Sequence, residues 1–195
     1  MTDRRLKVFF ILFSLFVVFA SSGFAFEAPS VSFDAGLSSG YPFYGDSNLK
    51  DANAHIDDGG FRMIIGTVAD VNLKLAEYLT VFAGNDNVFD LNWHGEDFFN
   101  HMDTSFFTGI KVYPGIGGLN FSVAYSIGTR FDFAGESKGV DSASWGNGFR
   151  LGMEYNFAHA DENRYMPSIG AYYRFVPRGN NTYDNLLCVY LLANF

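Results

Sequence analysis

Residues 119–133 read LNFSVAYSIGTRFDF, and apolar and polar side chains alternate along them with a period of two. Apolar side chains fill seven odd positions between Leu119 and Phe133, whereas polar side chains fill even positions such as Asn120, Ser126 and Asp132. Successive side chains of a β-strand point to opposite faces. The segment is therefore predicted to be a strand with one apolar and one polar face.

The same alternation recurs in seven further segments, which brings the number of predicted strands to eight. The segment at 105–113 is the weakest, because Phe107 and Tyr113 fall on the face opposite Ile110 and Val112. The seven segments are residues 30–44, 61–75, 79–84, 105–113, 148–157, 167–175 and 186–195.

The links between these strands alternate in length. Short links cover 76–78, 114–118 and 158–164, and longer ones cover roughly 42–60, 85–104, 134–147 and 176–184. All the large loops would then lie at one end of the structure. This arrangement predicts an all-β fold, an eight-stranded antiparallel up-and-down barrel that is closed and so leaves no open edge.

Alternation alone does not decide which face of the barrel points outward. A secreted, lipocalin-like ligand binder would place its apolar face inside, whereas a membrane barrel places that face against lipid. Three features favour the membrane barrel. The polar face is rich in Gly and Ser, its charges have mixed sign and can pair, as Arg130 and Asp132 can with Arg150 and Glu154, and aromatic residues gather near strand ends.

The last ten residues, LLCVYLLANF at 186–195, place an apolar side chain at every second position and end on Phe195. This pattern resembles the carboxy-terminal signature of bacterial outer-membrane β-barrels, and the whole chain is similar in architecture to small barrels of the OmpW, OmpX, OmpA and opacity type. The resemblance implies a bacterial outer-membrane location, short periplasmic turns and contact with membrane lipid. It also implies that the barrel-assembly machinery recognises the last strand, with Phe195 as the assembly signal.

The amino end has the layout of a secretory signal peptide. Arg4, Arg5 and Lys7 precede an apolar stretch at 8–20, and small residues stand one and three positions before a cut after Ala25. The predicted organisation is a signal peptide at 1–25 and one barrel domain at 26–195.

The charge and cysteine content limit the partners and the stabilising bonds. Residues 1–25 hold three of the 13 basic residues and one of the 21 acidic ones, so the remainder would carry a net charge of −10. This charge argues against nucleic acid as a partner. Cys188 is the single cysteine, so the chain cannot form an internal disulfide.

Eight strands enclose a lumen that side chains just fill, or that holds one small ligand. If the apolar face meets lipid, the lumen contains a charge network. Two interpretations stay open, a plug of mutually satisfied ion pairs and a gate in a passable conduit. The expected members are Arg62, Asp70, Lys74, Lys111, Arg130, Asp132, Arg150, Glu154 and Arg174.

The final strand is unusual because its second face is apolar as well. Leu186, Cys188, Tyr190 and Leu192 should form an apolar lumen wall beside small residues of the neighbouring strands. OmpW-like proteins are associated with uptake of hydrophobic molecules. The function expected first is therefore porin-like transport, as a passive channel or binder for small hydrophobic solutes.

The long predicted link at 85–104 supports a different class of function. It mixes aromatic side chains such as Phe89 and Trp93 with acidic ones, so a cell-surface adhesin acting through its outer loops is the alternative. His94, His101 and Asp103 in this link match no established metal-site spacing. They are interpreted as solvated loop residues, and no catalytic residue, cofactor or metal is expected.

Overall fold

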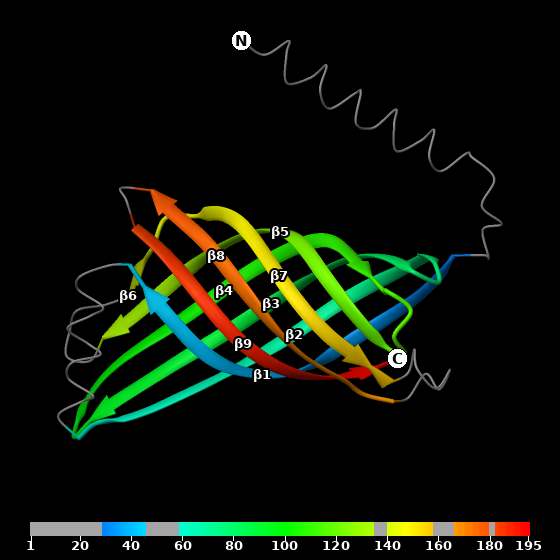
Figure 1. Ribbon diagram of the computed structural model, residues 1–195. Coiled ribbons are helices and arrows are strands. Elements are labelled where there is room, and N and C mark those ends of the chain that lie inside the picture. Colours follow the sequence, from blue (N-terminus) through cyan, green and yellow to red (C-terminus); the bar gives the residue numbers. More distant parts are fainter. Residues whose placement is uncertain (1–28, 46–58, 135–139, 158–165, 180–181) are drawn as a thin grey trace, which may run out of the picture.

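The computed structural model describes residues 29–45, 59–134, 140–157, 166–179 and 182–195 (Figure 1). Eight long strands form a closed antiparallel barrel, and a ninth, short strand extends its wall. The predicted eight-stranded up-and-down barrel is thus confirmed. The strands are β1 (Ser30–Tyr44), β2 (Phe61–Ala76), β3 (Leu79–His94), β4 (Asp97–Val112), β5 (Leu119–Ala134), β6 (Val140–Ser142), β7 (Gly146–Asn156), β8 (Ser168–Gly179) and β9 (Thr182–Asn194).

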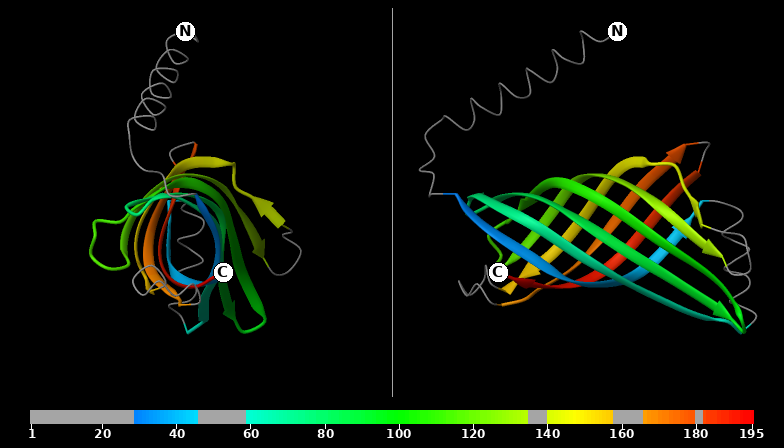
Figure 2. Two further views of the ribbon diagram at one scale, coloured as in Figure 1. Left: turned by 90° about the vertical axis from the view of Figure 1, so that its right-hand side faces the viewer. Right: turned by 180° about the vertical axis from the view of Figure 1, so that it is seen from behind.

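Closure follows from the pairing of the first and last strands. β1 pairs with β2 on one side and with β9 on the other, and β4 pairs with β5, so the eight long strands form a ring. The β2–β3 and β4–β5 links lie at one end, here called the turn end, together with the last residues of β7 and with Phe195 (Figure 2). The opposite end is called the loop end. No helix among the described residues is long and apolar enough to cross a membrane.

The period of two sorts the side chains between the outside and the lumen. In β9, Val189 is 60 % exposed on the outside, whereas the adjacent Cys188 is 1 % exposed in the lumen. In β5, Phe121 and Tyr125 are exposed, whereas Asn120 and Ser126 are buried. An apolar exterior around a polar interior is the reverse of the pattern in a water-soluble barrel, and it is the pattern of a transmembrane β-barrel.

Two of the predicted long links were wrong. β3 continues to His94 and β4 begins at Asp97, so the predicted link at 85–104 is a hairpin with a tight turn in which Gly95 has φ 63°. The predicted link at 176–184 is also largely strand, because β8 runs to Gly179 and β9 begins at Thr182. Charged residues made both segments resemble loops, yet in a polar lumen such residues belong to strands.

The wall divides towards the loop end. β1 pairs with β2 only as far as Ser38 and Gly66, and above this point it pairs with β9 alone. β5 likewise pairs with β7 only as far as Gly128. The ends of β2 to β5 therefore form a separate sheet, here called the flap (residues 61–65, 89–94, 97–102 and 131–134). In Figure 1 the ends of β2, β3 and β4 reach beyond the end of β1.

Candidate functional site: the charged lumen

The lumen is filled by side chains from alternate residues of all eight long strands, and every residue of the predicted charge network lies on the lumen side. Eight of the nine belong to ion pairs, in the sets described below: Arg62, Asp70, Lys111, Arg130, Asp132, Arg150, Glu154 and Arg174. The ninth, Lys74, lies near the turn end of β2 opposite Ser30 and has no ion pair among the described residues.

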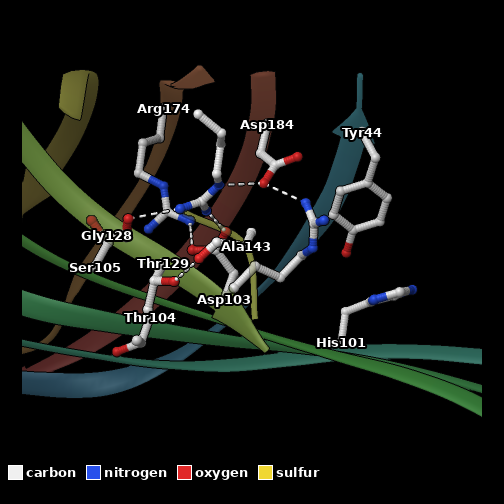
Figure 3. Close-up of polar contacts among 12 residues, drawn as sticks. Tyr44, His101, Asp103, Thr104, Ser105, Gly128, Thr129, Ala143, Arg174 and Asp184 are labelled. Atoms are coloured by element: carbon white, nitrogen blue, oxygen red, sulfur yellow. Dashed lines mark hydrogen bonds and ion pairs between the residues drawn. The ribbon is translucent and has the colours of Figure 1, made fainter. Parts of the chain in front are cut away.

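A set of arginine–aspartate pairs, here called the clamp, crosses the lumen in its loop-end half (Figure 3). The Arg174 guanidinium on β8 donates to Asp86 on β3 and to Asp103 on β4. Arg178, also on β8, donates to Asp103 at 2.8 Å and to Asp184 on β9 at 2.6 Å. The wall of β8 and β9 is thus tied directly to the opposite wall of β3 and β4.

Further members of the clamp tie the flap to the strands across from it. Arg130 on β5 donates to Asp184 at 2.5 Å and to Asp132 at 2.8 Å. The Tyr44 hydroxyl on β1 donates to Asp90 on β3 at 2.9 Å, and Arg62 donates to both carboxylate oxygens of Asp90. Pairs of this kind close the two wall divisions with side chains where backbone hydrogen bonds between the strands end.

The clamp is deeply buried and balanced in charge. Arg174 is 2 % exposed and Asp86 0 %. Desolvating a charge costs several kcal/mol, which only well-placed partners recover. Arginine suits this task because its planar fork holds carboxylates through two parallel hydrogen bonds. The clamp joins five arginines, Arg62, Arg130, Arg150, Arg174 and Arg178, to five aspartates, Asp86, Asp90, Asp103, Asp132 and Asp184.

An aromatic and aliphatic layer lies next to the clamp in the middle of the lumen. The Arg150 guanidinium lies over the rings of Phe107 and Tyr172, at 4.4 Å and 4.1 Å from their centroids. The predicted apolar wall of Leu186, Cys188, Tyr190 and Leu192 is fully buried here, in one cluster with Val68, Phe82 and Val88. These side chains share the cluster with residues of β2, β3 and β4, on the other side of the lumen.

A second charged group, here called the lysine cluster, lies near the turn end. The Lys111 ammonium on β4 is 3.7 Å from carboxylate oxygens of Asp34, Asp70 and Glu154, on three other strands. Asn72 donates to Asp34 at 2.7 Å and to Asp70 at 2.6 Å. One cation is therefore shared by three buried acids.

Further neutral donors complete the lysine cluster. Asn120 and the Tyr190 hydroxyl donate to Glu154 at 2.9 Å and 3.0 Å. Just beyond β4, burial raises the pKa of the Tyr113 hydroxyl to about 12, although the nearby Lys111 ammonium opposes the shift. Tyr113 therefore stays protonated and adds no further negative charge.

Several lumen residues were not predicted from the sequence. His101 and Asp103 were expected in a solvated loop; instead His101 is 2 % exposed and its Nδ1 lies 2.6 Å from Asp132 Oδ1. Even positions of β3 face the lumen between apolar odd positions such as Phe89 and Leu91, and this alternation was the available signal. The unpredicted charged residues are Asp34, Asp86, Asp90, Asp103, Arg178 and Asp184.

The histidine-rich segment does not form a metal site among the described residues. No group of three or more His, Cys, Asp or Glu side chains there has the arrangement of a metal site. Ser105, close in sequence to His101, is bonded instead to Ser126 at 2.6 Å. His55 and His159 lie outside the described residues, as does the predicted signal peptide.

Comparison with known proteins places the fold among the small bacterial outer-membrane β-barrels. Ail, the attachment invasion locus protein of Yersinia pestis, solved with the heparin analogue sucrose octasulfate, matches with a TM-score of 0.56 and 9 % identity, covering 87 % of this chain and 100 % of Ail. Neisserial surface protein A matches with a TM-score of 0.55 and 11 % identity, covering 87 % of this chain and 100 % of that protein. No protein-family model and no curated sequence matches the chain.

Proposed function

We propose that this is a bacterial outer-membrane protein whose barrel is a closed anchor and whose flap acts at the cell surface. Export would use residues 1–25, and the turn end would face the periplasm. The exterior supports this placement, because exposed aromatic rings border its apolar belt near both ends, as interfacial girdles do. These rings include Tyr41, Phe149 and Tyr183 towards the loop end and Phe33, Tyr155 and Phe157 towards the turn end.

The observation that carries the proposal is the clamp. Its ion pairs join opposite walls of the barrel, and a layer of buried apolar side chains lies next to them in the lumen. A hydrated solute would have to separate buried charge pairs, each of which costs several kcal/mol to break. The lumen is therefore better suited to rigidity than to conduction.

The flap supports a role in binding. Phe61 and Trp93 stack at its tip with their ring centroids 5.7 Å apart, and Phe98 pairs across from Trp93. Exposed aromatic groups are favoured anchors of protein interfaces. With a net charge of −8 the whole chain repels polyanions, so a partner with apolar and basic groups fits better than a sulfated sugar such as the ligand of Ail.

Conductance and surface labelling together test this proposal. The mature chain in a planar lipid bilayer should show no steady conductance, whereas Arg174→Met should produce transient openings. Glu96→Cys at the flap tip should react with a membrane-impermeant maleimide on intact cells, and Ile116→Cys at the turn end should react only after the outer membrane is permeabilised. Steady wild-type conductance, or the reverse labelling pattern, would overturn the proposal.

A second candidate function is the passage of small hydrophobic molecules through the lumen, the function expected first from the sequence. One observation favours it: beyond Ser38 the β1–β2 division is bridged by side chains alone. Ser39 Oγ donates to the Ile64 carbonyl at 2.7 Å, and the Arg62 guanidinium lies 4.9 Å from the Tyr41 ring centroid. Uptake of an apolar fluorescent dye by protein-containing vesicles, faster for Arg62→Ala than for wild type, would support this candidate over the closed anchor.

We also propose that the barrel is assembled through its last strand. Phe195 is 65 % exposed on the outside, and its backbone exchanges two hydrogen bonds with Phe33, so the strand that closes the ring ends on an accessible aromatic side chain. We expect Phe195→Ser to reduce the amount of heat-modifiable barrel in outer membranes, while the purified variant still refolds in detergent. Unchanged assembly in cells would contradict a role for Phe195 as the signal.

A further inference from the structure

The outward face of β2, β3 and β4 has a row of polar side chains in the middle of the apolar belt. Thr67 on β2 pairs in register with Asn87 on β3, and Asn87 pairs with Thr104 on β4. Asn85 lies one outward position below Asn87, and both fall near the centre of the 16-residue strand β3. The row is therefore distant from both ends of the barrel, where polar groups would meet water or headgroups.

The row is linked by hydrogen bonds along its length. The Asn87 amide donates to Thr67 Oγ1 at 3.4 Å and to Asn85 Oδ1 at 2.7 Å, and Thr104 Oγ1 donates to Asn87 Oδ1 at 2.6 Å. Asn85 in turn donates to the Ser105 carbonyl at 2.9 Å. The Thr67 hydroxyl accepts a bond and, among the described residues, donates none, so capacity for a further partner remains.

The opposite side of the barrel carries nothing comparable. At similar depth the outward residues of β7, β8 and β9 are apolar: Leu151, Met153, Ile169, Ala171, Leu187, Val189 and Leu191. Carboxamides in hydrocarbon are costly unless they find partners, and polar side chains facing the bilayer core promote association of membrane segments. The asymmetry thus marks one side of the barrel for contact with protein.

We propose that this polar row is the centre of a self-association interface, and that its occupant is a second copy of this chain. The proposal rests on the membrane placement proposed above, but not on whether the lumen conducts. Asn and Thr side chains each offer donors and acceptors and carry no charge, so the row complements itself.

The expected geometry places Asn87 at the contact point. Strands of small membrane barrels are tilted by roughly 35–45°. Rows on two barrels related by a two-fold axis along the membrane normal would therefore cross at their centre, bringing Asn87 opposite Asn87 of the second copy. Exposed apolar neighbours such as Ile65 and Phe106 would pack around the crossing. Such an interface is isologous, the commonest form in homodimers.

Cross-linking of the full-length chain in its membrane tests this geometry. In a Cys188→Ser background, Asn87→Cys should give a disulfide-linked dimer under mild oxidation, and the matched control Val189→Cys on the opposite face should not. A dimer formed only by Val189→Cys, no dimer from either variant, or a cross-link from Asn87→Cys to a different protein would each overturn the proposal.

A reversible measurement complements the cross-link. Energy transfer between labelled copies in lipid vesicles measures the affinity of the dimer. This affinity should fall about threefold to thirtyfold in Asn87→Leu. The control Val189→Ala should leave it unchanged, and an unchanged Asn87→Leu would overturn the proposal. Heat-modifiable mobility separates the two failures: an inserted barrel that stays monomeric refutes self-association alone, whereas a chain that does not insert refutes the membrane placement.

Discussion

The two charged regions of the lumen stabilise their buried carboxylates in different ways. The clamp matches five arginines with five aspartates, and members such as Asp103 and Asp184 have two arginine partners each. The lysine cluster has one cation, Lys111, for three carboxylates at 3.7 Å, and neutral donors supply the remaining bonds. The clamp is therefore redundant, whereas the lysine cluster depends on a single residue.

The largest effect is expected from removing that residue. Lys111→Met leaves Asp34, Asp70 and Glu154 buried without a cation, and the expected loss of unfolding free energy is about 5 kcal/mol at neutral pH. Urea unfolding in lipid vesicles measures the loss. The control Lys74→Met should change stability by less than about 1 kcal/mol, and an equal loss in this control would refute the dependence on Lys111.

Loss of one arginine from the clamp should cost less. In Arg174→Met, Asp103 keeps Arg178 as a partner and Asp86 keeps Arg150 at 3.9 Å, so about 3 kcal/mol is expected. Adding Asp86→Leu should recover part of the loss, because it removes the buried carboxylate that Arg174→Met leaves without its main partner. Urea unfolding of the single and double variants provides the comparison. The redundancy would be disproved if Arg174→Met were as damaging as Lys111→Met.

The period-two pattern predicted the barrel because it is a local property of the sequence, and 119–133 shows it most clearly. The clamp was harder to predict, because its pairs join residues such as Asp86 and Arg174 that meet only after the ring closes. In β3 the same residues that make the clamp, Asp86 and Asp90, also made the segment resemble a loop. An acidic residue in the lumen can be assigned to a strand with certainty only when its partners on distant strands are known.

A neutral member of the clamp should matter less than any of its charges. Tyr44→Phe removes one donor from Asp90 but leaves the two hydrogen bonds from Arg62, so the expected loss of unfolding free energy is about 1 kcal/mol. Urea unfolding monitored by circular dichroism measures it against Tyr173→Phe, an outward tyrosine on β8. A loss as large as that of Arg174→Met would mean that the flap depends on Tyr44 rather than on the ion pairs.

The smallest effect is expected at the division between β1 and β2 beside the clamp. The lysine cluster has no such division, because β1 and β2 are fully paired there. Ser39→Ala removes the Oγ hydrogen bond to the Ile64 carbonyl, at an expected cost of about 0.5 kcal/mol, because both groups are exposed. Amide hydrogen exchange is the sensitive measurement, since local opening is detected without global unfolding. Residues 61–65 should exchange faster than 66–74 in the wild type, and Ser39→Ala should widen the difference. Uniform protection along β2 would show that the clamp alone holds this edge of the flap closed.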